Sequence, residues 1–392
     1  MNLPISPLAS IAVLAVPLSF LAGCSCNDYD LTPFQGYDVL DSDHGQWLSM
    51  DISPDNRLAV AYHDRTYGGL GFALGEPQAD GTVGWLHERV DGYPDDNGLN
   101  PGTAGEFCSL TFDGSGTAWV SYFSRSNGVL KVAKRVRKQW TTEIIDTGSG
   151  LKPMAGLWTS IAINSDGLPV VAYQDGSAGT LKLATMGEDS TWSTETIREG
   201  TDWSGTDEAG EPIERAANVG QFARLLIDGN THYIAYYDQA NQNLQLLEGP
   251  PGSYVHSVVH ADINVGAWPS ISLGEEQLAI AYQDIHNQNL ILATRSGGGG
   301  FSTTILDEAE YVGADTEIFV KNGNFNIVYF DGRTNDMKLA ENDGSAWTSS
   351  TIGGDSAAVG FHNEVVQDLD GKWWAASYNF TDRNIYARWV GE

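Results

Sequence analysis

Positive charge is scarce in this sequence of 392 residues. Lysine and arginine together number 21, against 51 aspartates and glutamates, and the formal net charge is −30. A protein that binds nucleic acid needs a basic surface for the phosphate groups, so the composition excludes a general nucleic-acid-binding function. The acidic excess is typical of a soluble, exported protein, and it leaves open an attraction for cations or basic partners.

Common catalytic and metal-binding motifs are also missing. The sequence contains no G-x-S-x-G, no Walker motif, no C-x-x-C and no H-E-x-x-H. An EF-hand fails in segment 91–106, because Leu99 and Asn100 stand where an oxygen ligand and the glycine should be. We therefore predict no catalytic residue, no metal-binding residue and no cofactor, with a looser calcium site in 91–106 or 202–214 left open. Cys108 stands in an apolar context and is expected to be a small buried side chain.

Residues 5–22 form an apolar stretch with several small residues. An apolar segment of this length at the N-terminus is typical of a signal peptide. Its end, Leu21-Ala22-Gly23-Cys24, resembles the lipobox of bacterial lipoproteins.

This resemblance implies that residues 1–23 are removed and that Cys24 is lipidated. Residues 24–33 would then form a lipidated tether, and Ser25 after the cysteine implies the outer membrane. We therefore expect a protein of the cell envelope that is attached to the membrane by a lipid anchor. The alternative is a soluble secreted protein that is cleaved nearby.

The rest of the chain carries a seven-fold repeat. An aromatic residue is followed five positions later by a branched aliphatic residue in Phe34/Val39, Trp85/Val90, Trp140/Ile145, Trp192/Ile197, Tyr254/Val259, Phe301/Leu306 and Trp347/Ile352. A tyrosine ends a short apolar run at Tyr62, Tyr122, Tyr173, Tyr236, Tyr282, Tyr329 and Tyr378. A period of roughly 45 to 60 residues in a chain rich in strand patterns predicts a β-propeller of four-stranded blades.

The third repeat shows the four strands of a blade most clearly. Its apolar segments are 160–163, 169–173, 181–184 and 192–197. The turn residues Asn164-Ser165-Asp166-Gly167 join the first two segments as a hairpin. We name the strands A to D from the axis outward. Seven such units predict an all-β, seven-bladed propeller of four-stranded antiparallel blades over residues 34–392.

The last repeat lacks a D strand of its own, because the chain ends soon after its C strand. Residues 34–40 have the D-strand spacing but precede the first A strand. We predict that this N-terminal strand completes the last blade beside residues 384–390. Such closure of the ring leaves no unfinished blade with an exposed sheet edge.

The repeat consists of a D-G turn, then V-A-Y-x-D, then L-x-x-A and an aromatic residue. It resembles the sialidase-like or BNR-like propeller repeats of bacteria and, more distantly, the fucose-lectin propellers. The resemblance covers most of the chain and implies the fold, but it implies no single activity because propellers host many. The sialidase Asp-box, S-x-D-x-G-x-x-W, is not reproduced in this sequence.

An aspartate follows the tyrosine by two residues in five of the repeats. These residues are Asp64, Asp175, Asp238, Asp284 and Asp331. The recurrence predicts a structural role, in which the carboxylate accepts backbone N–H groups in a turn.

The connections from D strands to the next A strands are long, especially 91–106, 146–157 and 198–221. Long loops on a rigid scaffold often carry binding residues, so we assign function to the D–A face of the propeller.

Alignment on the tyrosines places one A-strand residue of each repeat near the mouth of the central channel. These candidate binding residues are Ser49, Ser109, Ser160, Arg224, Ser270, Glu317 and Glu364. With seven blades, Arg224 would lie across the channel from Glu364. As the only fixed positive charge of this set, Arg224 would hold a carboxylate or sulfate group of a ligand. The alternatives are a solvated ion pair in a polar channel, or catalytic use of Glu317 and Glu364.

The sequence thus favours a monomeric, non-catalytic propeller module that binds a glycan or protein partner on its D–A face. One alternative is a sialidase-like glycoside hydrolase that uses Glu317 or Glu364. The other is an envelope scaffold without a small-molecule ligand.

Overall fold

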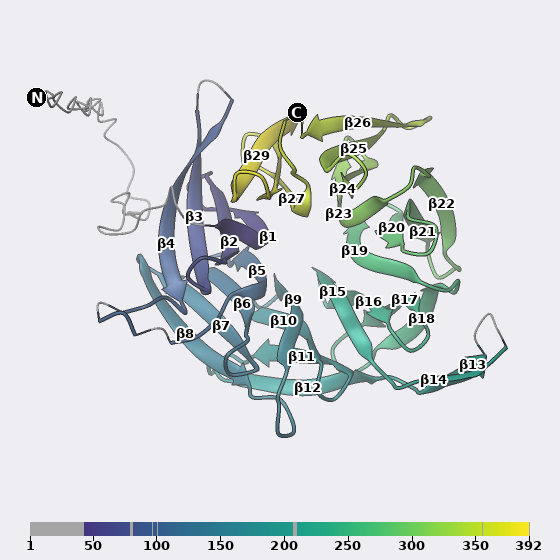
Figure 1. The fold of residues 1–392 in the computed structure, drawn as a ribbon, viewed down its shortest axis with the longest axis horizontal. Helices are drawn as coiled ribbons and strands as arrows, with labels where there is room; N and C mark the ends of the chain where they lie inside the picture. The colour runs from purple at the N-terminus through teal and green to yellow at the C-terminus, as the bar shows by residue number, and fades with distance from the viewer. Residues whose placement is uncertain are drawn as a thin grey trace, which may run out of the picture.

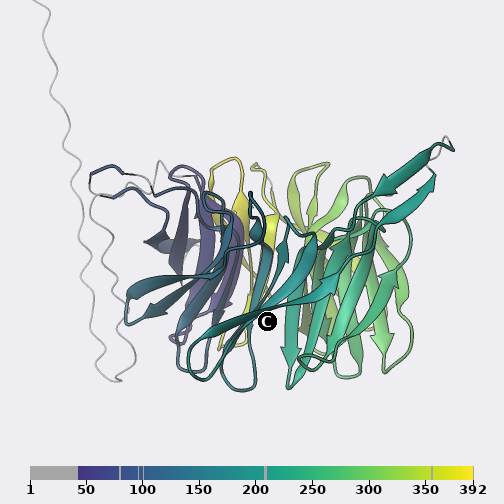
Figure 2. The same ribbon diagram turned by 90° about the horizontal axis from the view of Figure 1, so that it is seen from below.

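The computed structural model describes residues 43–78, 81–95, 97–99, 101–206, 210–354 and 356–391. These residues form seven antiparallel sheets arranged as a ring around a central axis (Figure 1). Seen from the side, the strands of all sheets span the thickness of one disc (Figure 2). The described residues contain no helix. The predicted all-β, seven-bladed propeller is confirmed.

The strands of each blade follow in chain order from the axis outward. The A strands are β1 (His44–Ile52), β5 (Glu106–Phe112), β9 (Ala155–Ile163), β15 (Val219–Asp228), β19 (Val265–Leu273), β23 (Val312–Lys321) and β27 (Phe361–Gln367). The B strands are β2 (Leu58–Asp64), β6 (Ala118–Ser124), β10 (Pro169–Asp175), β16 (Thr231–Asp238), β20 (Gln277–Asp284), β24 (Asn324–Asp331) and β28 (Trp373–Asn379). The C strands are β3 (Gly69–Pro77), β7 (Val129–Val136), β11 (Thr180–Met186), β17 (Asn243–Gly249), β21 (Asn289–Ser296), β25 (Asp336–Asn342) and β29 (Asn384–Gly391). The D strands are β4 (Val83–Asp91), β8 (Gln139–Asp146), β12 (Trp192–Glu199), β18 (Val255–His260), β22 (Ser302–Asp307) and β26 (Trp347–Gly353).

The seventh blade shows three strands in the described part of the chain, β27, β28 and β29. Residues 34–40, the predicted fourth strand, lie outside the described residues, as do the signal peptide, Cys24 and the tether. The ring nevertheless closes at its inner edge, because β1 contacts β27.

The D–A connection 198–221 contains regular structure that sequence patterns did not predict. It forms a hairpin of two short strands, β13 (Trp203–Thr206) and β14 (Pro212–Arg215), which projects from the disc in Figure 2. The predicted long loop is therefore a two-stranded extension. Its strands are short and polar, so no apolar periodicity marked them.

The hydrophobic core lies between blades. Val90 and Trp140, which belong to the aromatic–aliphatic repeat, pack against the buried cluster that blades one and two share. The cluster between blades seven and one contains Tyr62, Trp374 and Ile385. Each blade therefore buries its apolar surface only against its neighbours, which is the physical basis of the repeat.

Four of the repeated tyrosines, Tyr122, Tyr173, Tyr282 and Tyr329, bond to the end of the preceding D strand, whereas Tyr62 and Tyr236 bond within their own blades. All seven repeated tyrosines are buried. The hydroxyl groups of Tyr122 and Tyr173 donate hydrogen bonds of 2.6 Å to Asp91 and Asp146, at the ends of the preceding D strands. A hydroxyl group between packed sheets needs such a partner.

The recurrent aspartates have the predicted structural role. Asp64 accepts hydrogen bonds from the backbone N–H groups of Thr66 and Tyr67, and Asp331 accepts them from Arg333 and Thr334. Asp175, Asp238 and Asp284 make equivalent bonds in their blades. The carboxylates hold the turns that follow the B strands.

Candidate ligand-binding site at the channel mouth

Every A strand carries a β-bulge near its start. The pairing of A with B slips there in all seven blades, for example between Gln46 and Ser49. At each slip one non-glycine residue adopts a left-handed conformation, with φ between 47° and 55°. These residues are Trp47, Phe107, Trp158, Phe222, Trp268, Asp315 and His362. Because a bulge re-aims a side chain, we treat the seven as one set and call it the mouth ring.

A glycine precedes each mouth-ring residue by two positions. These glycines are Gly45, Gly105, Gly156, Gly220, Gly266, Gly313 and Gly360, with φ between 88° and 113°. A Cβ atom at Gly266 would lie 2.4 Å from the Cβ atom of Leu244 on the preceding blade. Only glycine lets the A strand pass so close to its neighbour in this conformation, so the glycine positions the bulge that follows.

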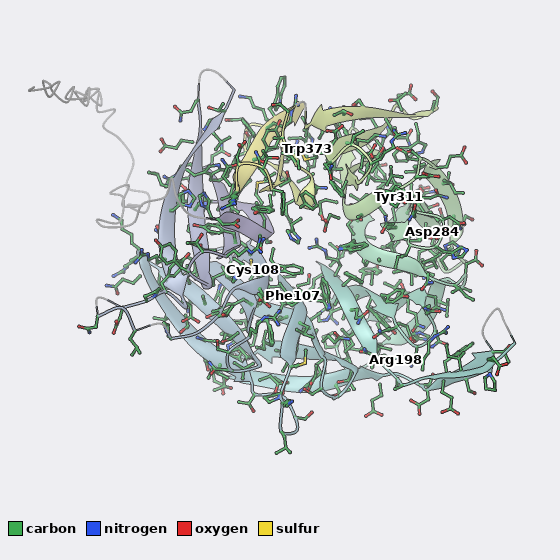
Figure 3. All side chains as sticks on the ribbon, in the orientation of Figure 1. Phe107, Cys108, Arg198, Asp284, Tyr311 and Trp373 are labelled. Carbon is green, nitrogen blue, oxygen red and sulfur yellow. The ribbon has the colours of Figure 1, made fainter. Side chains whose placement is uncertain are left out.

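The aromatic side chains of the mouth ring pack against one another around the axis. The centroid of the Phe107 ring lies 4.2 Å from the ring centroid of Trp47 and 4.4 Å from that of Trp158. Phe222 continues the series at 4.3 Å from Trp158 and 5.0 Å from Trp268. All five aromatic residues are half-buried, so part of their surface remains accessible. Phe107 is seen close to the axis in Figure 3.

Asp315 and His362 complete the mouth ring with polar groups. The Nδ1 atom of His362 lies 3.8 Å from an Oδ1 of Asp315, and the imidazole ring lies 4.7 Å from the ring of Trp47. Burial lowers the pKa of His362, so the imidazole is neutral at pH 7, and burial raises the pKa of Asp315. The ring therefore has an aromatic part from blades one to five and a polar part from blades six and seven.

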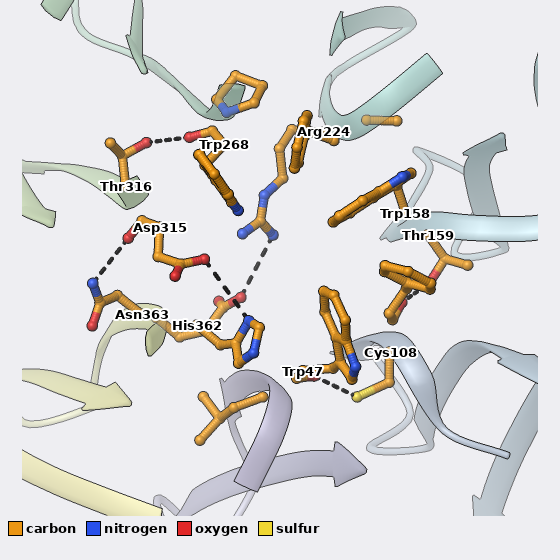
Figure 4. Close-up of a pocket in the computed structure, with 16 residues that line it drawn as sticks. Trp47, Cys108, Trp158, Thr159, Arg224, Trp268, Asp315, Thr316, His362 and Asn363 are labelled. Atoms are coloured by element: carbon orange, nitrogen blue, oxygen red, sulfur yellow. Dashed lines mark hydrogen bonds and ion pairs between the residues drawn. The ribbon is translucent and has the colours of Figure 1, made fainter. Parts of the chain in front are cut away.

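The mouth ring encloses a pocket with a cavity volume of about 80 Å³. In Figure 4, Trp47 and Trp158 lie on one side of the Arg224 guanidinium group, and Asp315 and His362 lie on the other. Glu364 also lines the pocket. Because the A strands begin on the face that the D–A connections reach, the pocket opens on the predicted face.

Arg224 lies between two glutamates, as the seven-fold alignment predicted. Its guanidinium nitrogens are 3.7 Å from a carboxylate oxygen of Glu317 and 3.5 Å from one of Glu364. Burial raises the pKa of both glutamates, and for Glu317 the negative charge of Glu364 adds to this effect while Arg224 opposes it. The single guanidinium group therefore only partly compensates the carboxylates that face it.

The four candidate serines lie in the channel wall, behind the pocket surface. The hydroxyl oxygens of Ser49, Ser109 and Ser160 accept hydrogen bonds from backbone N–H groups of the next blade at 3.0 to 3.1 Å. Ser270 lies 3.2 Å from the hydroxyl group of Thr316. None of the four lines the pocket within the described residues. A role of these serines in ligand binding stays a prediction, while their visible contacts join neighbouring A strands.

Side chains one position after the mouth ring hold the bulges in place. Thr159 donates to the carbonyl oxygen of Phe107 at 2.7 Å, and Thr316 donates to that of Trp268 at 2.6 Å. The thiol of Cys108 donates to the carbonyl oxygen of Trp47 at 2.8 Å. Cys108 is buried as expected, and burial raises its thiol pKa. These bonds satisfy carbonyl groups that the bulge removes from the sheet.

The mouth ring itself was not predicted from the sequence. The signal was available: G-x-aromatic occurs at Gly45, Gly105, Gly156, Gly220 and Gly266, each about four positions before the aligned A-strand residue. The alignment placed the residues after the bulge at the mouth, because a regular strand has no slip. Because of the bulge, the residues that form the mouth ring precede the aligned A-strand residues by two positions, as Trp47 precedes Ser49.

Two further features are absent from the described residues. No group of three or more His, Cys, Asp or Glu side chains there could hold a metal ion. No helix among them is long and apolar enough to cross a membrane.

Neither a protein-family model nor a curated protein matches this chain. Solved structures do resemble it in fold. The polysaccharide lyase Uly1 shares 10% identity with a TM-score of 0.55, covering 94% of both chains. A fungal alcohol oxidase of the AA5 family in complex with copper shares 12% identity, also with a TM-score of 0.55, covering 89% of this chain and 74% of its own.

The SapL1 lectin in complex with alpha methyl fucoside shares 15% identity with a TM-score of 0.49, covering 80% of this chain and 97% of its own. The NanB sialidase from Streptococcus pneumoniae is also among the similar structures, at 10% identity with a TM-score of 0.42, covering 91% of this chain and 69% of its own. A lyase and an oxidase with the same TM-score show that the shared feature is the propeller fold.

Proposed function

We propose that this protein is a non-catalytic, glycan-binding propeller that is held at the cell envelope by a lipid on Cys24. The ligand-binding site is the mouth pocket on the D–A face. The observation that carries the proposal is the composition of the mouth ring, in which five half-buried aromatic residues face a polar sector of Asp315 and His362, with Arg224 and Glu364 lining the pocket.

A sugar ring has an apolar face of C–H groups and an edge of hydroxyl groups. An aromatic ring can cover the apolar face, and charged or amide side chains can bond the hydroxyl groups. Binding sites for small ligands typically combine an apolar lining with a few polar groups that orient the ligand. The pocket is narrow, so it suits the terminal residue of a glycan better than an internal one.

The left-handed conformations support a role beyond packing. Seven non-glycine residues with positive φ occur at equivalent positions, and each is sparsely populated for its residue type. Backbone strain of this kind, of order 1 kcal/mol per residue, concentrates at sites where side-chain direction matters. A simple apolar plug of the channel would need no such repeated distortion.

The second candidate function is a glycoside hydrolase. It is favoured by one observation, the raised pKa of Glu317 and Glu364, because such pairs provide acid and base groups in hydrolases. Against it, both carboxylates face the same guanidinium group of Arg224, which is a suitable arrangement for a fixed charge network.

A glycan array on the soluble propeller, followed by calorimetry with the best ligand, tests the proposal. Trp158→Ala removes one aromatic face and should weaken binding by about tenfold or more. Trp389→Ala is the matched control, because this tryptophan is exposed and lies outside the pocket. Equal loss with both variants, or no glycan bound by the parent protein, would contradict the proposal. Release of reducing sugar from a bound glycan would favour the hydrolase.

The lipid anchor is tested separately in cells. A fatty-acid analogue should label the parent protein and not the Cys24→Ala variant, and only the labelled form should sediment with membranes. Labelling of both proteins to the same extent would contradict lipidation at Cys24.

A further inference from the structure

The groups around the mouth pocket carry an excess of negative charge. Among the described residues, the carboxylates that line the pocket are those of Asp315 and Glu364, and Glu317 lies 3.7 Å from the one lining cation, Arg224. His362 is neutral at pH 7 because burial lowers its pKa. Burial raises the pKa of these three carboxyl groups, and a bound ammonium group would favour their ionised forms, in which three negative charges face the one positive charge of Arg224.

From this arrangement we propose that the pocket recognises a positively charged group, the ammonium group of an amino-sugar residue at the end of a glycan. The inference rests on the proposed function, because it names the class of glycan that the same pocket takes. It replaces the expectation that Arg224 holds an acidic ligand.

Two features of the mouth favour a cation. The aromatic sector places Trp47, Trp158 and Trp268 around the entrance, and the faces of indole rings attract ammonium groups. The polar sector offers the carboxylate of Asp315, which lies across the same small pocket from Trp158 in Figure 4. An ammonium group between them would contact negative charge on both sides, from ring faces and from carboxylates.

Arg224 is poorly placed to select an anion. Its guanidinium group already faces Glu317 and Glu364, at 3.7 and 3.5 Å. An acidic ligand would have to displace one carboxylate and then remain close to it, along with Asp315. Repulsion between like charges in a partly enclosed site opposes that exchange.

The remaining surface agrees with this preference. The formal net charge of −30 surrounds the mouth with a field that attracts cations and repels polyanions. Arg125, which lies beside the start of β5, is paired with the carboxylate of Glu106 at 2.6 Å.

Calorimetry with three tetrasaccharides that differ in charge tests the inference. The cationic probe is a β-1,4-linked glucosamine tetramer, the neutral probe is its N-acetylated form, and the acidic probe is a galacturonic acid tetramer. At about neutral pH we expect the glucosamine tetramer to bind at least about tenfold more tightly than the neutral probe, with an affinity that falls as salt is added. The acidic probe should not bind.

Two variants assign the preference to the pocket. Glu364→Gln removes a carboxylate that lines the pocket and should reduce the advantage of the glucosamine tetramer over its N-acetylated form, while thermal unfolding verifies that the ring is intact. Glu188→Gln changes an exposed carboxylate and should leave the preference unchanged.

The outcomes separate the inference from the proposed function. Equal or tighter binding of the neutral or acidic tetramer, lost in Trp158→Ala, would overturn the ammonium preference and leave glycan binding at this pocket in place. Binding of a lysine-rich peptide without any of the tetramers would overturn both, as would an absence of all binding.

Discussion

The two sectors of the mouth ring share one backbone and differ in chemistry. Blades one to five place Trp47, Phe107, Trp158, Phe222 and Trp268 at the bulge. Blades six and seven place Asp315 and His362 there, in the same left-handed conformation. The A-strand position two residues later is serine in blades one, two, three and five, Arg224 in blade four, and Glu317 and Glu364 in blades six and seven. The repeat therefore determines the backbone of the mouth ring, and the different side chains of blades six and seven give the pocket one aromatic side and one polar side.

The largest effect is expected where the two sectors meet, between blades seven and one. If residues 34–40 complete the last blade, their deletion exposes the edge of β29 and leaves the ends of the ring joined by the contacts of β1 with β27, β28 and β29. We expect loss of cooperative unfolding. The stabilising free energy that is lost with a whole strand should be comparable to the usual free energy of unfolding of a domain, about 5 to 15 kcal/mol.

Deletion of residues 25–33 is the control for that experiment. The tether is not assigned to the ring, so its removal should leave thermal unfolding of the soluble protein unchanged. Cooperative unfolding after deletion of 34–40, at the parent temperature, would show that the seventh blade is complete without this segment.

A smaller but still large effect is expected from the backbone that both sectors share. Gly266→Ala adds a Cβ atom that would lie 2.4 Å from Leu244 in a residue with φ of 105°. We expect the free energy of unfolding to fall by about 3 kcal/mol, since the clash and the backbone strain add. Urea unfolding measures this loss. Gly114→Ala, which meets no atom within 4 Å, should change stability little.

Removal of the cation in the polar sector should have a moderate, pH-dependent effect. Arg224→Met leaves Glu317 and Glu364 without the guanidinium group that faces both. We expect a loss of about 1 to 2 kcal/mol at about pH 8, discounted because the Arg224 side chain is partly exposed. The loss should shrink at about pH 5, where the carboxyl groups can take up protons.

Arg65→Met provides the matched control for that experiment. Its side chain is 61% exposed and lies 3.8 Å from Asp43, so its removal should change stability little at either pH. A pH-independent effect of Arg224→Met would show that packing of its side chain, rather than its charge, stabilises the mouth.

The smallest effect concerns the slope of stability with pH. The raised pKa of Glu317 means that the folded protein holds this proton more tightly than the unfolded chain does. Its contribution to stability therefore falls as the pH rises from the ordinary glutamate value toward the raised one. Glu317→Gln should flatten the fall in melting temperature between about pH 5 and about pH 9. If melting temperature fell with pH as steeply in Glu317→Gln as in the parent protein, the pH dependence would come from a group other than Glu317.

The fold could be predicted from the sequence because each blade repeats the same local needs. A buried tyrosine, an aspartate in the following turn and an aromatic–aliphatic D strand recur in the blades. The aspartate bonds within its own turn, while the tyrosine Tyr122 and the D-strand residue Val90 contact the neighbouring blade. Such patterns determine the number of blades, their strand order and the face that the D–A connections reach. They also placed Arg224 across the axis from Glu364, because blades four and seven are three blades apart in a ring of seven; the 3.5 Å approach of the two side chains is a finding of the structure.

Only the tertiary structure decided which side chains surround the mouth. The bulge shifts the register of each A strand, so Trp47 and its six equivalents reach the pocket while Ser49, Ser109 and Ser160 turn to the next blade. A period-two strand pattern carries no sign of that shift. The shift arises from contact between blades. Gly266, for example, passes close to the C strand of the preceding blade, and Trp268, two residues later, adopts the left-handed conformation of the bulge.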